Sequence, residues 1–241
     1  MANIHISIQG KGGIGKSFIC LLSAQYRKSK GRPMRLFDAD PVNPTLASFK
    51  ALEALSVELM HGDEIDTRRF DSIVEAVIGT EVDALIDVGT SSFVPMAHYL
   101  VSNHVPELLT DSGHRVILHT VIAGGPDCFE TLEKFHQLVM QFPKETGFVV
   151  WLNPFDGPVE IDGKPFEQLK AYKENKARID AIVDLPTFKQ ETFGKDVSDM
   201  LSQNLTFDEA LASADFPVMV RHRLKSVRDQ FYNELDKAAV F

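Results

Sequence analysis

The residues with the clearest chemical potential stand together near the start of the chain. Two lysines and a serine alternate with glycines in the run Gly10-Lys11-Gly12-Gly13-Ile14-Gly15-Lys16-Ser17. Glycines allow backbone N–H groups to turn inward around an anion. A lysine at the end of such a loop can reach the β- and γ-phosphates of a nucleotide, and a serine hydroxyl can ligate Mg²⁺. The run therefore predicts a phosphate-binding loop.

The residues on either side of this loop support the interpretation. Residues 4–8 are rich in β-branched side chains and predict a strand, while the apolar residues after Ser17 predict a mostly buried helix. The start of that helix adds partial positive charge to an anion site. The alternative is a glycine-rich turn that binds nothing, which strand and helix flanks disfavour. We expect phosphate contacts from Gly10, Gly12, Gly13, Ile14, Gly15, Lys16, Ser17 and Phe18.

Three aspartates complete the expected site. Asp38 and Asp40 follow the second predicted strand, and Asp87 ends another predicted strand. In an open parallel sheet, ligands bind beyond the carboxyl ends of the strands, so all three carboxylates should point toward the phosphate loop. Asp87 fits the role of holding Mg²⁺ directly or through water. Each aspartate alone would be interpreted as a helix cap or loop residue, but convergence on one phosphate loop favours function.

The strand and helix pattern predicts a doubly wound α/β fold, with a mostly parallel sheet and helices on both faces. Several strands are continuous Val/Ile/Leu runs, as expected when both faces are covered. Strands are expected at residues 4–8, 34–38, 82–88, 115–122, 148–153 and 178–185. Helices are expected at 17–29, 45–55, 68–78, 93–109, 128–141, 166–175, 195–204 and 218–238. A small hairpin around Asp162-Gly163 should decorate the loop after Asn153.

Composition sets wider bounds. The 241 residues include 44% hydrophobic residues, and no linker-like tract divides them, so we expect a single domain over residues 1–241. The loop begins within ten residues of the first Met, which leaves no room for a signal peptide and favours a cytoplasmic protein. Two cysteines are too few for a disulfide framework. The net charge of −9 argues against a dedicated nucleic-acid coat, although a basic patch could still exist.

The phosphate loop with its second lysine, followed by Asp38-Ala39-Asp40-Pro41, resembles the deviant Walker A ATPases of the ParA/MinD class. The resemblance covers nearly the whole chain. Within the class, the chain is most similar to conjugal-transfer proteins encoded on transmissible plasmids. That narrower match rests on length and on the runs Ile8-Gln9-Gly10-Lys11-Gly12-Gly13 and Asp40-Pro41-Val42-Asn43.

The resemblance implies ATP or ADP and Mg²⁺ as ligands, and a homodimer in the ATP state. Lys11 would act across the dimer on the partner's phosphates, as an arginine finger does, whereas by spacing alone it could be an ordinary solvated lysine. Lys16 and Ser17 would bind phosphate and Mg²⁺, Asp40 would position the attacking water, and Asp38 and Asp87 would hold waters around the metal. Asn153 would read adenine, because its amide offers a donor and an acceptor, with a second adenine contact starting at Pro186.

Some features depart from the class. Residues 87–92 lack the double proline that many partition ATPases carry, so the partner and motion of this γ-phosphate-sensing loop are open. No helix-turn-helix extension precedes the loop. The final helix carries Arg221, Arg223, Lys225 and Arg228 opposite an apolar stripe, and we expect it to pack on the sheet rather than to bind membrane stably. Its basic residues could touch DNA phosphates without sequence preference.

The leading interpretation is an ATP-driven dimerisation switch that hydrolyses ATP slowly and recruits a protein partner in conjugal transfer. A partition or positioning ATPase on non-specific DNA, a metabolic ligase of the dethiobiotin synthetase type, and a scaffold that binds nucleotide without hydrolysing it are the alternatives. An iron–sulfur reductase would need two cysteines at a dimer interface. Cys20 falls within the first helix, where a buried core residue is expected.

Overall fold

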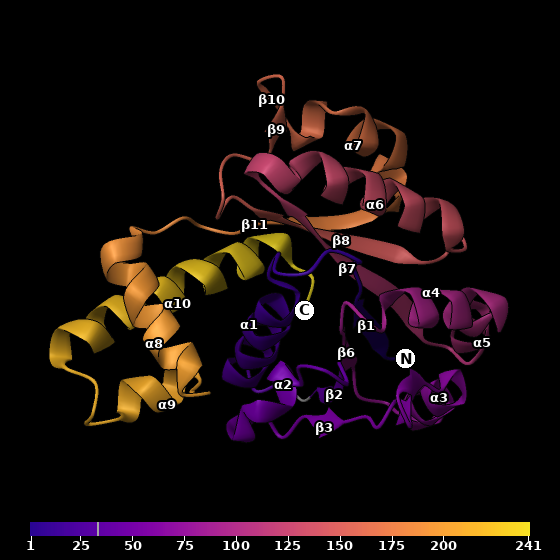
Figure 1. The fold of residues 1–241 in the computed structure, drawn as a ribbon, viewed down its shortest axis with the longest axis horizontal. Helices are drawn as coiled ribbons and strands as arrows, with labels where there is room; N and C mark the ends of the chain where they lie inside the picture. Colours follow the sequence, from indigo (N-terminus) through magenta and orange to yellow (C-terminus); the bar gives the residue numbers. More distant parts are fainter. Residues whose placement is uncertain (33) are drawn as a thin grey trace.

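A seven-stranded parallel sheet forms the centre of the computed structural model, which describes residues 1–32 and 34–241 (Figure 1). The strand order is β11-β8-β7-β1-β6-β2-β3, and every neighbouring pair runs parallel. This arrangement confirms the predicted doubly wound α/β fold. The strands are β1 (Asn3–Ser7), β2 (Arg35–Ala39), β3 (Leu55–Ser56), β6 (Ala84–Val88), β7 (Arg115–Ala123), β8 (Gly147–Asn153) and β11 (Ile179–Asp184).

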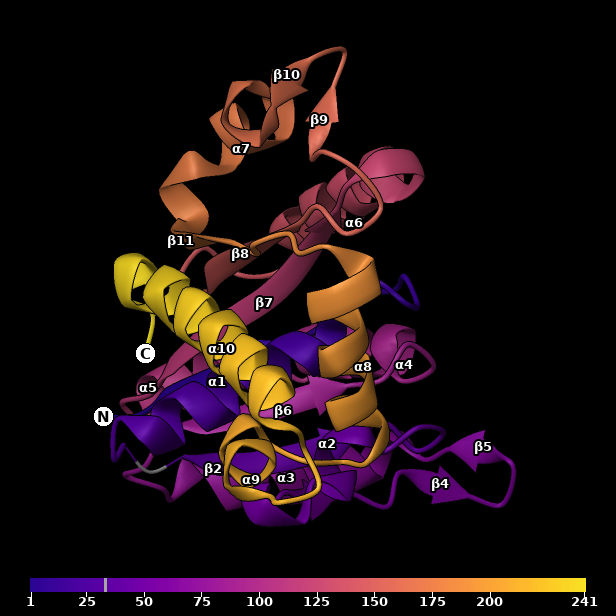
Figure 2. The same ribbon diagram turned by 90° about the vertical axis from the view of Figure 1, so that its left-hand side faces the viewer.

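Helices cover both faces of the sheet because successive strand residues point to opposite sides. Leu118 of β7 packs in one core with Phe135, whereas its neighbour Ile117 packs in another with Leu224. Figures 1 and 2 show the two layers. The first core involves α3 (Asp71–Ile78), α4 (Phe93–Ser102), α5 (Val105–Asp111) and α6 (Cys128–Gln141); the second involves α1 (Lys16–Ser29), α8 (Lys195–Ser202), α9 (Phe207–Ala212) and α10 (Val218–Ala238).

Smaller elements decorate the sheet. The predicted hairpin around Asp162-Gly163 is confirmed, with both residues at positive φ, 51° and 69°, as a tight two-residue turn requires. Together with α7 (Lys170–Asn175) it projects from the top of Figure 2. The remaining elements are α2 (Thr45–Ser48), the hairpins β4 (Met60–His61) with β5 (Glu64–Ile65) and β9 (Glu160–Ile161) with β10 (Lys164–Pro165), the 3₁₀ turns Lys50–Leu52, Thr67–Phe70, Gly125–Asp127, Phe166–Gln168 and Lys176–Arg178, and a π turn Gln190–Gly194.

Three predicted helices are wrong in extent. The helix expected at 166–175 is divided by the extended residue Leu169 into the 3₁₀ turn Phe166–Gln168 and α7. The helix expected at 93–109 is divided into α4 and α5, because His104 adopts the left-handed conformation and Pro106 lies in the first turn of the next helix. The helix expected at 45–55 ends at Ser48, and the chain turns through Glu53, at φ 54°, into the edge strand β3. Across the described residues, no helix combines the length and apolarity that crossing a membrane requires.

Candidate functional site

The predicted phosphate and metal residues gather at the carboxyl edge of the neighbouring strands β1, β6 and β2. Asp87 of β6 is the register partner of Ser7 on one side and of Asp38 on the other. The phosphate loop leaves β1 at the same edge and leads into α1 at Lys16. Parallel topology therefore brings together residues that lie up to 80 positions apart in the chain.

The phosphate loop has the backbone that its glycines allow. Gly13 and Gly15 adopt φ values of 77° and 100°, which side-chain-bearing residues rarely reach. Ile14 between them is buried, and the ring of Phe18 packs edge-on against Phe231, with ring centroids 5.5 Å apart. Ile14 and Phe18 can therefore serve a phosphate only through their backbone groups.

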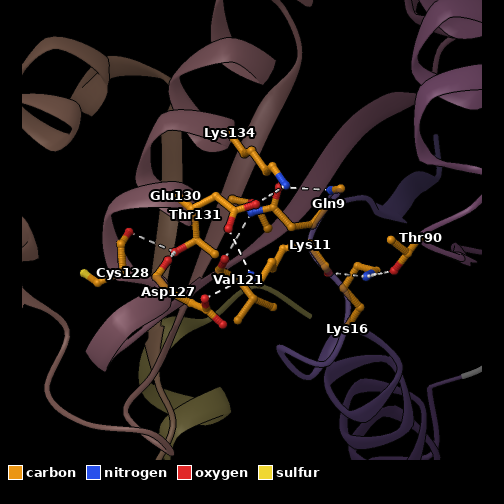
Figure 3. A network of polar contacts seen from close by, with 12 residues as sticks. Gln9, Lys11, Lys16, Thr90, Val121, Asp127, Cys128, Glu130, Thr131 and Lys134 are labelled. Carbon is orange, nitrogen blue, oxygen red and sulfur yellow. Dashed lines mark hydrogen bonds and ion pairs between the residues drawn. The ribbon is translucent and has the colours of Figure 1, made fainter.

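Lys16 is a buried ammonium held only by neutral oxygens. Its Nζ donates to the carbonyl oxygen of Lys11 and to the hydroxyl of Thr90, each at 2.9 Å (Figure 3). The residue is 8% exposed, and it forms no ion pair with any residue that the structure describes. Burial lowers its pKa, against the opposing fields of Asp87 and Asp40. A buried cation without a carboxylate partner is incompletely compensated, so the site favours an incoming anion.

Asp87 is a buried acid at the same site as the buried cation of Lys16. Burial raises its pKa to about 6, while the neighbouring Ser17 hydroxyl lowers it. Neither carboxylate oxygen, nor the hydroxyl of Ser7, has a hydrogen-bond partner of ordinary geometry within the described part of the chain. Orphaned buried oxygens beside a serine are the donor type that Mg²⁺ prefers, so these residues fit that ion. No cluster of three His, Cys, Asp or Glu side chains that could hold a metal alone occurs among residues 1–32 and 34–241. A metal here would need Ser17 and phosphate oxygens as well.

Asp38 and Asp40 are fixed by backbone donors. Asp38 accepts from the N–H of Asp40 at 3.1 Å and from that of Ala47 at 2.9 Å, and its pKa is raised by burial against these bonds. Asp40 accepts from the N–H groups of Val42 and Asn43, each at 3.0 Å.

Gly89, which the sequence reasoning missed, allows Asp40 to lie against the end of β6. A Cβ at Gly89 would come within 2.3 Å of the Asp40 carboxyl carbon, so only glycine leaves room there. The Asp40 side chain is thus held against the end of β6, but its catalytic role stays a prediction.

Lys11 is bound within its own chain. Its Nζ lies 3.0 Å from a carboxylate oxygen of Asp127 and 2.9 Å from one of Glu130, and Lys134 contacts the other oxygen of Glu130 at 2.6 Å (Figure 3). The hydrogen bond to Glu130, then that to Asp127, raises the pKa of Lys11. Its side chain is 29% exposed and lies in ion pairs, and its action on a partner's phosphates stays a prediction. Sequence reasoning missed both acids, which lie just before α6 and in its first turn, more than 110 residues away.

The two predicted adenine contacts lie beside each other at the ends of β8 and β11. Asn153 donates to the carbonyl oxygen of Ile14 at 3.0 Å and accepts from the N–H of Phe155 at 3.2 Å, so its amide is tied to the phosphate loop. The amide nitrogen and the amide oxygen of Asn153 each retain one further hydrogen-bonding position. Leu185 donates its N–H to the carbonyl of Leu152, which places Pro186 at the start of the neighbouring loop. No observation tests either contact with adenine.

The final helix packs as expected. Leu224, Val227, Phe231 and Leu235 are all buried in the core under α10. Two of its arginines are engaged in ion pairs, Arg223 with Asp196 and Arg228 with Asp208 and Asp229. Cys20 and Cys128 are both free and buried, in agreement with the expectation that Cys20 is a core residue.

Comparison with known proteins places this geometry in a family. No protein-family model matches the chain. The MinD protein of Aquifex aeolicus, solved in complex with MinC, superposes with a TM-score of 0.50 over 97% of this chain and 96% of that one, at 12% identity, which shows the shared fold. Two TraL proteins of Escherichia coli are each 51% identical over 240 residues, covering all of both chains. The narrower resemblance predicted from the sequence is thereby confirmed, and the chain belongs to the TraL family, with a fold shared with MinD.

Proposed function

We propose that this protein is a Mg-ATP-dependent dimerisation switch that hydrolyses ATP slowly and recruits or positions a partner in plasmid conjugal transfer. The observation that carries the proposal is the buried Lys16 ammonium, which rests on neutral oxygens beside the orphaned carboxylate of Asp87. An anion that brings its own metal ion satisfies both groups at once. The conjugal role rests on membership of the TraL family.

The nucleotide roles follow from the positions of the groups. Inward N–H groups of residues 10–18 and the start of α1 hold the phosphates, and Lys16 supplies their main counter-charge. Ser17, Asp87 and Asp38 would hold Mg²⁺ directly or through water, and the ion when bound neutralises charge on the phosphates. Asn153, with Pro186 beside it, would select adenine over guanine, since guanine presents the opposite donor and acceptor pattern.

Dimerisation would bring the same edges of two chains together. Large apolar side chains are exposed after four strands on this edge, at Val42, Val94, Phe129 and Phe155. Exposed apolar groups gathered on one edge support a surface that another protein covers. Each Lys11 would then exchange its carboxylate partners for phosphates of the other chain, while Asp40 aligns the attacking water. The dimer would persist only as long as the γ-phosphate holds both lysines.

Light scattering with ATP, with ADP and without nucleotide tests this function. We expect a dimer with ATP and a monomer in the other two conditions. Asp40→Asn keeps an oxygen for the N–H groups of Val42 and Asn43 but cannot accept a proton from water, so it should accumulate as an ATP-bound dimer. A variant that binds ATP and stays monomeric would contradict both the dimer and the role of Asp40.

A further inference from the structure

The loop after β7, residues 124–127, stays bonded to the loop after β8, residues 154–158, beyond the paired residues of the two strands. The N–H of Gly124 donates to the carbonyl of Asn153 at 2.8 Å, and the next N–H donates to the carbonyl of Pro158 at 3.2 Å. Adjacent strands usually separate into independent loops where their register ends. Here the two loops form one bonded unit at the carboxyl edge of the sheet.

Glycines allow the backbones of these two loops to touch. A Cβ at Gly124 would overlap the carbonyl oxygen of Gly157. A Cβ at Gly125 would overlap the carbonyl oxygen of Asp156. Gly125 and Gly157 also adopt φ values of 66° and 140°, where a residue with a side chain is strained. A proline follows each of these two glycines and stiffens its loop, so a displacement of one loop moves the other.

Asp127 connects the loop after β7 to the phosphate loop. Its carboxylate lies 3.0 Å from Nζ of Lys11 (Figure 3). Its backbone is held by the buried hydroxyl of Thr131, which donates to the Asp127 carbonyl at 2.9 Å and accepts from the N–H of Ala123 at 3.1 Å. The carboxylate that restrains Lys11 is thus fixed to the end of β7, two residues after the glycine contact.

Asn153 connects the loop after β8 to the same phosphate loop. Its Nδ2 donates to the carbonyl of Ile14 at 3.0 Å, and its Oδ1 accepts from the N–H of Phe155 at 3.2 Å. These bonds fix the amide in the orientation that leaves one donor and one acceptor for adenine. Guanine, with the opposite pattern, needs the amide turned over, which breaks both bonds, so guanine cannot draw the loop in the same way.

The ion pair between Lys11 and Asp127 is the weakest contact in this series. Its side chains are 29% and 35% exposed, and partly exposed ion pairs contribute little. The glycine contact, in contrast, is backbone on backbone and cannot be compressed. When a base bonds to Asn153 and draws the loop after β8 toward itself, the ion pair is therefore the contact that loosens.

We propose that Gly157 is a positioning residue that transmits adenine binding from Asn153 to Asp127 and thereby loosens Lys11 for the assembled dimer. The base then controls dimerisation as well as affinity, and a nucleotide with the wrong base leaves Lys11 restrained. The inference rests on the proposed function and adds the contact through which the base acts on Lys11.

Amide hydrogen exchange with Mg-ADP tests the transmission in the full chain, because ADP carries the base and does not form the proposed dimer. In the wild type, exchange at residues 124–131 should become faster with Mg-ADP and not with Mg-pyrophosphate, which lacks the base. Gly157→Ala, whose Cβ would lie 3.1 Å from Cα of Gly125, should still bind Mg-ADP by calorimetry but lose this change. Gly163→Ala is the control, since its Cβ meets nothing within 4 Å at a similarly positive φ of 69°, and should keep it.

Light scattering supplies a second readout. At saturating nucleotide, the wild type should dimerise at about fivefold lower protein concentration with a non-hydrolysable ATP analogue than with the matching GTP analogue. Gly157→Ala should lose this difference. Asp127→Asn removes the carboxylate on which the base acts and leaves the glycine contact intact, so it should dimerise equally well with both analogues.

Three results would overturn the coupling and leave the proposed function standing. These are a wild type that dimerises equally with both analogues, a Gly157→Ala protein that keeps the exchange change with Mg-ADP, and an Asp127→Asn protein that keeps the base dependence. Asp127→Asn decides if Gly157→Ala does not fold, and the exchange comparison decides if the GTP analogue does not bind. A wild type that binds neither Mg-ADP nor the ATP analogue contradicts the proposed function as well.

Discussion

Lys11 and Lys16 stand five positions apart in one loop and have opposite surroundings. Lys11 lies half-buried between the carboxylates of Asp127 and Glu130, at 3.0 and 2.9 Å. Lys16 is buried and touches only a carbonyl and a hydroxyl. The pKa of Lys11 is raised by its acidic partners, while that of Lys16 is lowered by burial. One lysine has its charge compensated within the chain, and the other does not.

This difference indicates when each lysine can act. Lys16 needs no rearrangement of ion pairs to accept an anion, so it should serve a single chain. Lys11 must leave two carboxylates before it can serve a phosphate, and a second chain that excludes water could favour that exchange. The difference therefore supports the proposal that Lys16 serves nucleotide binding and that Lys11 acts in the assembled dimer. Three experiments test this proposal, and a fourth tests the effect of burial on a base elsewhere in the molecule.

Replacement of Lys11 should have the largest effect. If it stabilises transition-state charge across the dimer, Lys11→Ala should lower ATP turnover by about 10³-fold or more, as loss of an arginine finger does. Binding of ATP to the monomer, measured by calorimetry, should stay within about twofold, well under the contribution of one hydrogen bond. Lys134→Ala, which removes the neighbouring lysine on Glu130, is the control and should keep turnover. Turnover at the wild-type rate in Lys11→Ala would make this lysine merely structural.

Replacement of Lys16 should weaken binding itself. Lys16→Ala removes a buried cation that donates to the phosphates, and charge-assisted hydrogen bonds contribute about 1.5–3 kcal/mol each. We expect affinity for both Mg-ATP and Mg-ADP to fall about 100-fold or more by calorimetry. Lys28→Ala, which removes a surface lysine of the same helix, is the control and should bind normally. Unchanged affinity in Lys16→Ala would remove this residue from the site.

The buried side chain of His5, away from the site, shows what burial does to a base whose ordinary pKa is lower than that of a lysine. His5 and His119 share a hydrogen bond of 2.9 Å, and Trp151 donates to the other nitrogen of His119 at 3.0 Å. His119 therefore donates to His5, and both rings are neutral. Burial lowers the pKa of His5 to about 3. Burial therefore leaves His5 neutral, whereas the buried ammonium of Lys16 can bind an anion.

The sign of the pH effect follows from this shift. His5 binds fewer protons when folded than when unfolded, so its contribution to stability is present above pH 6.5 and is lost as the pH falls toward about 3. His5→Leu should make thermal unfolding less sensitive to acid, by about 2–3 kcal/mol near pH 4.5. His98→Leu, at an exposed position, should retain the wild-type acid sensitivity. Equal pH profiles for His5→Leu and wild type would contradict the neutral buried pair.

The sequence predicted the parts of the molecule whose signals are local or follow from topology. The bounds of α6 and α10 match the predicted ranges, since both helices carry a long amphipathic period. The gathering of Asp38, Asp40 and Asp87 followed from the rule that parallel strands end at one edge. The two-residue strand β3 was missed because so short an edge carries no periodic signal. The break at His104 was missed although Pro106 marked it.

The surroundings of the two lysines could not be predicted in the same way. The pairing of Lys11 with Asp127 and Glu130 joins the loop after β1 to the start of α6, and nothing near any of these residues in the sequence indicates it. The hydrogen bond from Lys16 to Thr90 spans 74 positions and uses a residue type that is common in loops. Side-chain partners of this kind depend on how loops settle over the sheet edge, which residue spacing does not encode.

The smallest expected effect concerns the carboxylates that hold Lys11. Glu130→Gln keeps the shape of the side chain and removes one of the two negative charges on this lysine. Because the pair is partly exposed and Asp127 remains, the change in dimerisation should be at most a few-fold.

The direction of this change in dimerisation decides between two roles of Glu130. If Lys11 must leave these carboxylates, the variant forms the ATP-bound dimer at lower protein concentration in light scattering. If Glu130 instead positions Lys11 for the partner's phosphates, the variant needs more protein. Glu133→Gln makes the same charge change at an exposed position of α6. It therefore shows whether a change in dimerisation comes from the net charge or from the loss of the ion pair with Lys11. We expect the first result, since Lys11 cannot fully serve two acids and a phosphate at once.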